Sequence, residues 1–281
     1  MTNYAAIPLA DARVEGELGG KAVQLGAAIR AGLSVPSGVA LAADTAAACC
    51  RGDPTAMATL AAIRRSLAGP LAVRSSCVGE DTAAASFAGQ YETRLGVTTR
   101  AQLAAAVTAV WRSACQREAG AYRRKLGLSD SPRMAVVIQR LVQPDVAGVL
   151  FTRDPVTGAD ERLIEAAWGL GEAVVQGLVT PDRYRLSRGG EVLEQAPGRK
   201  EHAIRALANG STTAEPVPPA RAKALCLDST QLAALQHLAL RCEETFPGPS
   251  DIEWAIAGGI LWLLQRRPVT ALCDGPRRAP A

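Results

Sequence analysis

The sequence predicts a chain of mixed α/β or α+β class. Apolar residues at helical spacing alternate along the chain with short strands rich in β-branched residues, and this alternation is typical of both classes. Helices are predicted at residues 42–68, with an interruption at 52–54, and at 99–126 and 229–246. Residues 134–142 are rich in β-branched side chains, which predicts a buried strand.

The domain organisation is predicted to be two lobes that meet near Val142. A chain of 281 residues is long enough for one large or two modest domains. We expect an N-terminal lobe at 1–142, a C-terminal lobe at 143–275 and a loose tail at 276–281, where proline and arginine are frequent. A cleft between two such lobes is a common place for a ligand.

The composition limits the class of partner. With 48% hydrophobic and 21% charged residues the chain is globular, and a net charge of +4 with 4% aromatic residues argues against a nucleic-acid partner. Seven cysteines without C-x-x-C spacing argue against a disulfide framework or zinc site. There is no apolar run of membrane-spanning length and no signal-peptide pattern, so we expect a cytoplasmic protein without membrane contact.

Residues 251–268 are predicted to form a β-hairpin, because two apolar runs flank a Gly-Gly pair. Side chains alternate between faces along a strand, so the register decides which residues meet. A two-residue turn would pair Ala257 with Ile260. Glu253 and Gln265 would then lie on opposite faces.

A three-residue loop with a bulge would instead pair Glu253 with Gln265 and Asp251 with Arg267. We favour this register because it collects oxygen ligands and a guanidinium on one face, which suits a polyphosphate with Mg²⁺. An ordinary solvated face of an edge hairpin is the alternative. In the favoured register the opposite face would form core, from Ile252, Trp254, Ile256, Trp262 and Leu264.

Two positively charged residues in the first lobe are candidates for an anion site. A Gly-Gly pair and Lys21 are predicted to begin a helix that ends at Gly32, and an anion could bind at this helix N-terminus. Arg74 ends a strand that leads into a loop of small residues at 79–90, whose N–H groups could bind phosphate oxygens. A solvated lysine, and an arginine in a structural ion pair, are the alternatives.

Four segments of the chain, in sequence order, resemble the nucleotide-binding domain of the family of pyruvate phosphate dikinase, phosphoenolpyruvate synthase and rifampin phosphotransferase. They are GGKAVQLG at 19–26 with AGLSVPSG at 31–38, AVRSS at 72–76 with SFAGQ at 86–90, GVLFTRDP at 148–155 with GLGE at 169–172, and DIEW at 251–254 with LQRRPVT at 264–270. The resemblance covers residues 15–270, and it is most similar to the rifampin phosphotransferase branch at 166–204.

The resemblance implies an α+β ATP-grasp fold, in which two lobes clamp ATP. It also implies the residues that bind the nucleotide. Lys21 and Arg74 would hold the phosphates, and Glu172 would lie near the ribose. The strand end that would line the adenine consists of Gln139, Arg140, Leu141 and Val142. Lys200 would add a further positive charge.

The resemblance further implies that Glu253 and Gln265 hold Mg²⁺ and that Arg267 contacts the transferring phosphates. Lys21, Arg74 and Arg267 would then be the catalytic residues, since phosphoryl transfer depends on alignment and neutralisation of charge. These positions agree with the hairpin register that alternation alone favours.

The sequence departs from the family at several points. Arg266 stands where the family has Ser or Ala, Ser250 stands where it has Gln, and residues 39–70 are shorter than usual. The Thr-Ser-His-Ala-Ala pattern of the phosphate-carrying histidine domain is absent, and His202 and His237 lie in other contexts.

We therefore expect a Mg-ATP-binding component of dikinase type, which passes a phosphoryl or pyrophosphoryl group to a histidine on a separate partner protein. A self-sufficient ATP-grasp kinase or ligase that acts on a small-molecule acceptor is the alternative. A regulatory module that has lost catalysis is a third hypothesis, which the presence of all the implied ligands disfavours.

Overall fold

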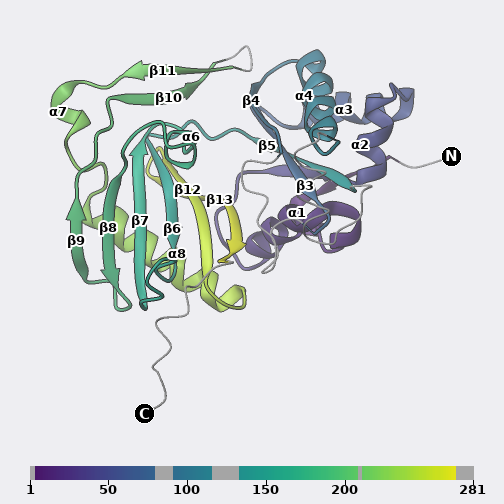
Figure 1. Ribbon diagram of the computed structural model, residues 1–281. Coiled ribbons are helices and arrows are strands. Elements are labelled where there is room, and N and C mark those ends of the chain that lie inside the picture. The colour runs from purple at the N-terminus through teal and green to yellow at the C-terminus, as the bar shows by residue number, and fades with distance from the viewer. Residues whose placement is uncertain (1–3, 80–90, 116–132, 208–210, 270–281) are drawn as a thin grey trace. The chain divides into compact units, whose positions relative to one another are not determined.

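The computed structural model describes residues 4–79, 91–115, 133–207 and 211–269 (Figure 1). The chain divides into two compact units. Unit 1 consists of residues 1–142 and 206–213, and unit 2 consists of residues 143–205 and 214–281. Both units combine helices with antiparallel strands, which confirms the α+β class.

Unit 1 contains a five-stranded antiparallel sheet in the order β1-β2-β5-β3-β4. Its strands are β1 (Ala6–Pro8), β2 (Gly38–Leu41), β3 (Leu71–Cys77), β4 (Thr93–Val97) and β5 (Met134–Arg140). Its helical elements are η1 (Leu9–Asp11), α1 (Glu15–Arg30), α2 (Ala43–Cys50), α3 (Pro54–Ser66) and α4 (Arg100–Ser113).

The predicted interruption of the helical stretch 42–68 is confirmed, because α2 and α3 are separate helices. Asp53 causes the new start. Its carboxylate accepts hydrogen bonds from the backbone N–H groups of Thr55 and Ala56 at 2.9 and 3.0 Å, and Pro54 stands at the first helical position.

The core of unit 1 lies between α2, α3, α4 and one face of the sheet. Leu60 of α3 and Leu103 of α4 belong to the same buried cluster as Val73 of β3 and Ile138 of β5. Because side chains alternate along a strand, Arg74 and its neighbours on the other face point away from this cluster. That second face carries α1 (Figure 1).

Unit 2 contains a six-stranded antiparallel sheet in the order β13-β12-β6-β7-β8-β9. Its strands are β6 (Val146–Phe151), β7 (Glu161–Trp168), β8 (Asp182–Ser187), β9 (Val192–Ala196), β12 (Ser250–Ala257) and β13 (Ile260–Pro268). β10 (His202–Ala206) and β11 (Thr212–Pro216) pair with each other. The helices that follow β7 are α6 (Glu172–Val175), α7 (Pro219–Ala222) and α8 (Ser229–Thr245).

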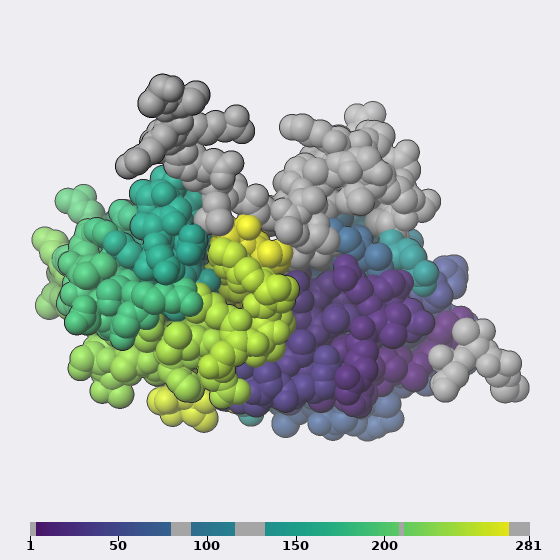
Figure 2. Space-filling model, turned by 90° about the horizontal axis from the view of Figure 1, so that it is seen from below, coloured from purple at the N-terminus to yellow at the C-terminus, as the bar shows by residue number. Residues whose placement is uncertain are grey.

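Helix α8 lies against one face of the six-stranded sheet (Figure 1). Its buried side, which includes Leu235 and Ala239, faces the sheet, and the atoms of this part of the chain that reach the surface are lime green in Figure 2. A capping box between Asp228 and Gln231 fixes its start. The predicted helix at 229–246 is thereby confirmed.

Some predicted elements differ from the structure. The stretch 206–222 is rich in Ala, Pro, Thr and Gly, a composition that predicts a linker or an exposed loop, but it contains β11 and α7. The side chains of β11 are mostly exposed, so no apolar periodicity announces this strand. The helix predicted at 99–126 corresponds to α4, which ends earlier, at Ser113, because Ala114 and Cys115 form a turn. The remainder of the predicted range, from 116, lies outside the described residues. None of the helices in the described ranges has the length and apolar character that a membrane span requires.

Candidate nucleotide and metal site

The hairpin of β12 and β13 has the predicted pairing. Glu253 lies opposite Gln265, and Asp251 lies opposite Arg267. Cross-strand partners share a face, so two carboxylates, an amide and a guanidinium lie on one side of this hairpin. β13 is an edge strand of the sheet, and β12 lies between β13 and β6, with which it also pairs.

The prediction of a three-residue loop is wrong. Ala257 pairs with Ile260, so the turn has two residues, Gly258 and Gly259, with φ angles of 55° and 76°. Two consecutive positive φ angles belong to a type I′ turn, whose twist matches that of antiparallel strands. Such a turn alone would separate Glu253 from its amide partner.

A β-bulge at Leu264 restores the pairing. Trp254 pairs with Leu263 and Glu253 pairs with Gln265, so Leu264 is an extra residue on β13. The extra residue reverses the alternation of the strand, and Gln265 thereby changes face. The bulge was expected at the loop and lies instead within the strand.

The bulge also changes the buried face of the hairpin. Ile252, Trp254 and Ile256 are buried, as predicted. On β13, however, Leu263 is buried, whereas Trp262 and Leu264 are half-buried. The expected core positions on β13 were therefore wrong, because the alternation was counted from a three-residue loop.

Asp251 is a buried acid with one oxygen satisfied. Arg267 Nε donates a hydrogen bond of 2.7 Å to Asp251 Oδ2. Asp251 Oδ1 is buried and has no hydrogen-bond partner among the described residues. Burial raises the pKa of Asp251 above its ordinary value of 3.8, and Glu253 adds to the rise, while Arg267 opposes it. A cation at this face would relieve both the burial cost and the repulsion.

The donor set of this face fits Mg²⁺. Magnesium prefers oxygen ligands and is usually bound by one or two carboxylates together with phosphates and water. Glu253 and Gln265 supply such oxygens, and the unpartnered Oδ1 of Asp251 lies on the same face. No group of three or more His, Cys, Asp or Glu residues could hold a metal ion within the described ranges, so the remaining ligands would come from phosphate and water.

In unit 1, Lys21 is buried on α1 with 5% of its surface exposed, so the solvated alternative is wrong. Its Nζ donates a hydrogen bond of 2.9 Å to the carbonyl oxygen of Ser75 on β3. Gly19 has a φ of 74°, and a Cβ there would lie 1.9 Å from the Ser76 carbonyl oxygen. Glycine is therefore required at this position for α1 to approach β3.

Ser76 joins the two sides of the break at Gly19. Its Oγ donates to the Leu18 carbonyl at 2.7 Å and accepts from the Ala22 N–H at 3.0 Å, which caps the helical part that carries Lys21. The range Glu15–Arg30 contains two helical parts separated by a kink at the non-helical residue Gly19, so the part that carries Lys21 begins at the predicted glycine pair.

Arg74 points to the sheet face that carries α1. Ser76, two residues further along β3, contacts α1, and positions two apart share a face. Lys21, Arg74 and Gln139 of unit 1 therefore belong to the same side of the sheet. The small-residue loop predicted to cover phosphates, including 86–90, lies outside the described residues, since 80–90 are not described.

The end of β5, which was predicted to line the adenine, makes several hydrogen bonds within the protein. Gln139 is buried, and its Nε2 donates a 3.0 Å hydrogen bond to the Pro36 carbonyl. The backbone N–H of Leu141 donates a 2.8 Å hydrogen bond to the Pro70 carbonyl. Arg140 is exposed and Val142 is buried. Contacts to a nucleotide from this segment stay a prediction.

Glu172 is the first residue of the short helix α6 and follows the Gly-Leu-Gly break at 169–171. It is half-buried. Gly169 has a φ of 80°, and a Cβ there would lie 2.5 Å from the Ile204 carbonyl oxygen, so the first glycine of this motif serves a close backbone approach. The predicted contact of Glu172 with ribose stays a prediction.

Lys200 is fully buried and forms an ion pair with Asp182, which is also fully buried. Asp182 Oδ1 also accepts from the Gly198 N–H, and Oδ2 accepts from the Cys226 N–H, each at 2.7 Å. Burial, together with the charge of Asp182, raises the pKa of the Cys226 thiol far above its usual range. The sequence did not reveal this pair, and it gives Lys200 a structural role.

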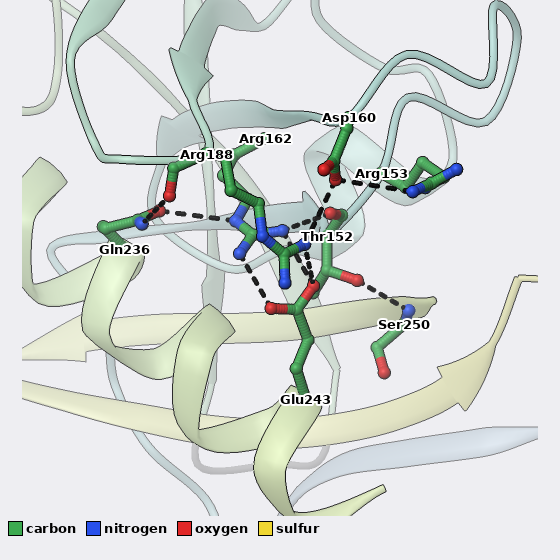
Figure 3. A network of polar contacts seen from close by, with 8 residues as sticks. All are labelled: Thr152, Arg153, Asp160, Arg162, Arg188, Gln236, Glu243 and Ser250. Carbon is green, nitrogen blue, oxygen red and sulfur yellow. Dashed lines mark hydrogen bonds and ion pairs between the residues drawn. The ribbon is translucent and has the colours of Figure 1, made fainter. Parts of the chain in front are cut away.

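A second polar network missed by the sequence attaches α8 to the sheet (Figure 3). Arg162 of β7 is fully buried and makes two 2.8 Å hydrogen bonds to the carboxylate of Glu243 on α8. Arg188 bonds the same carboxylate at 2.8 Å and Asp160 at 3.1 Å. The partners are up to 81 residues apart, so no local pattern could predict them.

The last hairpin of this α+β chain carries oxygen ligands, from Glu253 and Gln265, of the kind that bind Mg²⁺. This arrangement is compatible with a nucleotide-binding protein. Comparison with known families agrees. Residues 55–279 match the family described as "Pyruvate phosphate dikinase, AMP/ATP-binding domain". The chain belongs to this family, which confirms the predicted resemblance.

Curated relatives carry several names. The chain is 40% identical over 210 residues to "Rifampicin phosphotransferase" of Streptomyces sviceus, which covers 74% of this chain and 24% of the relative. It is 40% identical over 204 residues to "Probable phosphoenolpyruvate synthase" of Methanothermobacter thermautotrophicus, covering 72% and 30%. The chain thus spans less than a third of the length of these relatives.

Solved structures that resemble the chain include ATP-grasp ligases. A D-alanine–D-alanine ligase from Bacillus anthracis complexed with ATP has a TM-score of 0.41 and 11% identity, over 93% of this chain and 58% of the ligase. The ATP-grasp ligase PsnB, complexed with a minimal precursor, has a TM-score of 0.38 and 11% identity, over 90% of this chain and 53% of PsnB.

Proposed function

We propose that this chain binds Mg-ATP and is the ATP-binding component of a dikinase-type phosphotransferase. Its family membership supports nucleotide binding, and the names of its relatives support phosphoryl transfer. The observation that carries the proposal is the pairing of Glu253 with Gln265 and of Asp251 with Arg267 on one face of the last hairpin.

The hairpin supplies the metal-binding part of the proposal. Glu253 and Gln265 hold Mg²⁺, which neutralises the charge of the phosphates when it is bound. Arg267, which Asp251 orients through the 2.7 Å hydrogen bond, contacts the phosphates that are transferred. A bidentate-capable guanidinium held in this way can stabilise charge that develops on the phosphoryl oxygens.

Unit 1 supplies positive charge to the phosphates in this proposal. Lys21 is fixed by its burial and by Ser75, and Arg74 lies on the same sheet face. The strand end at 139–142 lines the adenine, and Glu172 lies near the ribose. Lys200 adds positive charge to the site, although its ion pair with Asp182 limits how far Nζ can move.

The phosphoryl or pyrophosphoryl group passes, in this proposal, to a histidine on a separate partner protein. Neither His202 nor His237, the two histidines of these 281 residues, has the Thr-Ser-His-Ala-Ala context of the family's carrier histidine, so neither is proposed as the acceptor. His202 lies on β10, and His237 lies on α8.

The experiment is an incubation of the purified chain with ATP and Mg²⁺, alone, with small acceptors, and with a histidine-domain protein. ADP, AMP and phosphate are followed over time. The proposal predicts ATP binding without acceptor turnover until the histidine protein is added, and loss of the Mg²⁺-dependent reaction in Glu253→Ala. Turnover of a small acceptor by the chain alone would instead identify a self-sufficient kinase or ligase.

A further inference from the structure

Arg266 stands between Gln265 and Arg267 and points to the opposite face of β13. Only 5% of its surface is exposed. Its Nε donates a 2.9 Å hydrogen bond to Ser250 Oγ, and its Nη2 donates a 3.2 Å hydrogen bond to the Pro247 carbonyl. The guanidinium also lies over the ring of Phe246, 4.7 Å from the ring centroid.

The partners of Arg266 belong to two other parts of unit 2. Ser250 begins β12, and Phe246 and Pro247 follow the end of α8. Arg266 therefore joins the last strand to the start of its neighbour and to the end of the helix. A buried arginine with a planar, multiply bonded head has one well-defined position, unlike a surface arginine.

The contact continues into the network of Figure 3. Ser250 N donates to Thr152 Oγ1 at 2.9 Å, and Thr152 N donates to the Ser250 carbonyl at 2.9 Å. The Thr152 carbonyl in turn accepts from Arg162 Nη1, and Arg162 is paired with Glu243 of α8. A continuous set of hydrogen bonds thus leads from β13 to the helix.

The bulge gives this attachment its importance. Because Leu264 is an extra residue, the face that each later residue of β13 presents depends on where the alternation restarts. A slip by one residue would turn Gln265 and Arg267 to the buried face. Arg266 opposes such a slip, because a slip would break its hydrogen bonds to Ser250 and Pro247 and its contact with the Phe246 ring.

We propose that Arg266, with Ser250 as its acceptor, is a positioning residue for the Mg²⁺ site. It rests on the proposed function, because Glu253 and Gln265 are taken as the metal ligands. Arg266 touches neither nucleotide nor metal. It holds the register in which Gln265 meets Glu253, and through this register it sets the affinity for Mg²⁺ in the ATP complex.

The test compares Arg266→Met and Ser250→Ala with the wild-type chain. The first keeps the apolar stem and removes the donors, and the second removes only the acceptor. Arg185→Met is the matched control, because Arg185 of β8 is ion-paired to Glu161 of β7 and Glu194 of β9, and β8 is remote from β13 in the sheet order. Calorimetry measures ATP affinity in EDTA and across a Mg²⁺ titration, and thermal unfolding checks the fold.

We expect Mg²⁺ to bind about 10-fold more weakly in the ATP complex of Arg266→Met, as is typical when a residue that orients a metal ligand is lost. Ser250→Ala should also weaken Mg²⁺ binding. ATP affinity in EDTA should stay within about twofold in both variants, since no nucleotide contact is removed. Arg185→Met should match the wild type in both measurements.

Other outcomes are decisive. A wild-type chain whose ATP affinity ignores Mg²⁺ would overturn the proposed function, and the inference with it. If Mg²⁺ raises the ATP affinity of the wild type, and Arg266→Met and Arg185→Met both show the same increase, the inference about Arg266 is overturned but the proposed function stands. Equal loss with and without metal would reduce Arg266 to a structural role. If Arg266→Met does not fold, Ser250→Ala decides by the same criteria.

Discussion

Two buried aspartates of unit 2 differ in how completely they are satisfied. Asp182 is paired with Lys200, and both of its oxygens accept backbone hydrogen bonds as well. Asp251 is paired with Arg267 through one oxygen, while its Oδ1 is buried with no hydrogen-bond partner among the described residues. One pair is closed, and the other leaves an acceptor unused.

This difference is what we expect if Asp182 belongs to a structural pair and Asp251 to a binding pair. A buried acceptor without a partner costs about 1–3 kcal/mol, and a bound cation at Asp251 Oδ1 would remove that cost. The closed pair of Asp182 joins β8 to the segment before β10 and to the one before α8. The open pair lies on the hairpin face that we assign to Mg²⁺.

Loss of the closed pair should have the largest effect on stability. Lys200→Met would leave the charge of Asp182 buried without compensation, which is expected to cost about 3–5 kcal/mol in the free energy of unfolding. Urea unfolding measures it. Arg185→Met, which breaks a partly exposed pair, should cost less than about 1 kcal/mol. A similar small loss in Lys200→Met would show that the Asp182 pair is not structural.

Loss of the metal ligand should affect binding and spare the fold. Glu253→Ala removes a half-buried carboxylate, so its free energy of unfolding should change by no more than about 0.5 kcal/mol. The Mg²⁺-dependent gain in ATP affinity should fall on the order of 100-fold, equivalent to about 3 kcal/mol. Calorimetry with and without Mg²⁺ measures it. An unchanged gain would remove Glu253 from the metal site.

The open pair should show itself in the pH dependence of stability. Burial raises the pKa of Asp251 in the folded state, so the unfolded state releases this proton at lower pH. The stability that the protonated acid contributes is therefore fully present below pH 3.8, the ordinary pKa of the acid, and is lost as the pH rises through the raised pKa of the folded state.

Asp251→Asn removes this titration and keeps an acceptor for Arg267. Linkage therefore predicts that, without Mg²⁺, the melting temperature of the variant minus that of the wild type increases from about pH 4 to neutrality. Added Mg-ATP should stabilise the wild type more than the variant, because both keep Glu253 and Gln265 but only the wild type has the buried carboxylate whose charge the cation offsets. A difference that is constant with pH would show that the burial of Asp251 is without consequence.

The smallest effect is expected from deletion of Leu264. Removing the extra residue brings Gln265 next to Leu263, and Gln265 then pairs with Glu253 without a bulge. The Mg²⁺ dependence of ATP affinity should persist in this variant. Its loss would show that the local twist of the bulge, and not the register alone, is required.

The hairpin illustrates what could be predicted from the sequence. The pairing of Glu253 with Gln265 followed from alternation and from the chemistry that would gain by it. The turn did not, because two glycines allow both a two-residue turn and a bulged loop. The position of the bulge at Leu264 depends on what each face packs against, and a local pattern does not contain that.

The helices were predicted best, since capping residues and apolar periodicity act locally. Asp53 and Asp228 mark helix starts in the sequence and in the structure. The buried pairs were missed for the opposite reason. Arg162 meets Glu243, and Lys200 meets Asp182, only through the tertiary fold, so no local pattern indicated either pair, and Lys200 was expected at the nucleotide site instead.

The central claim is that Glu253 and Gln265 together hold the magnesium of bound ATP. A crystal of the chain with Mn²⁺ and a non-hydrolysable ATP analogue tests it through the anomalous signal of the metal. The account predicts an anomalous peak about 2.0–2.3 Å from an oxygen of each side chain, at distances typical of such ions. A peak bound to the analogue but remote from both Glu253 and Gln265 would contradict it.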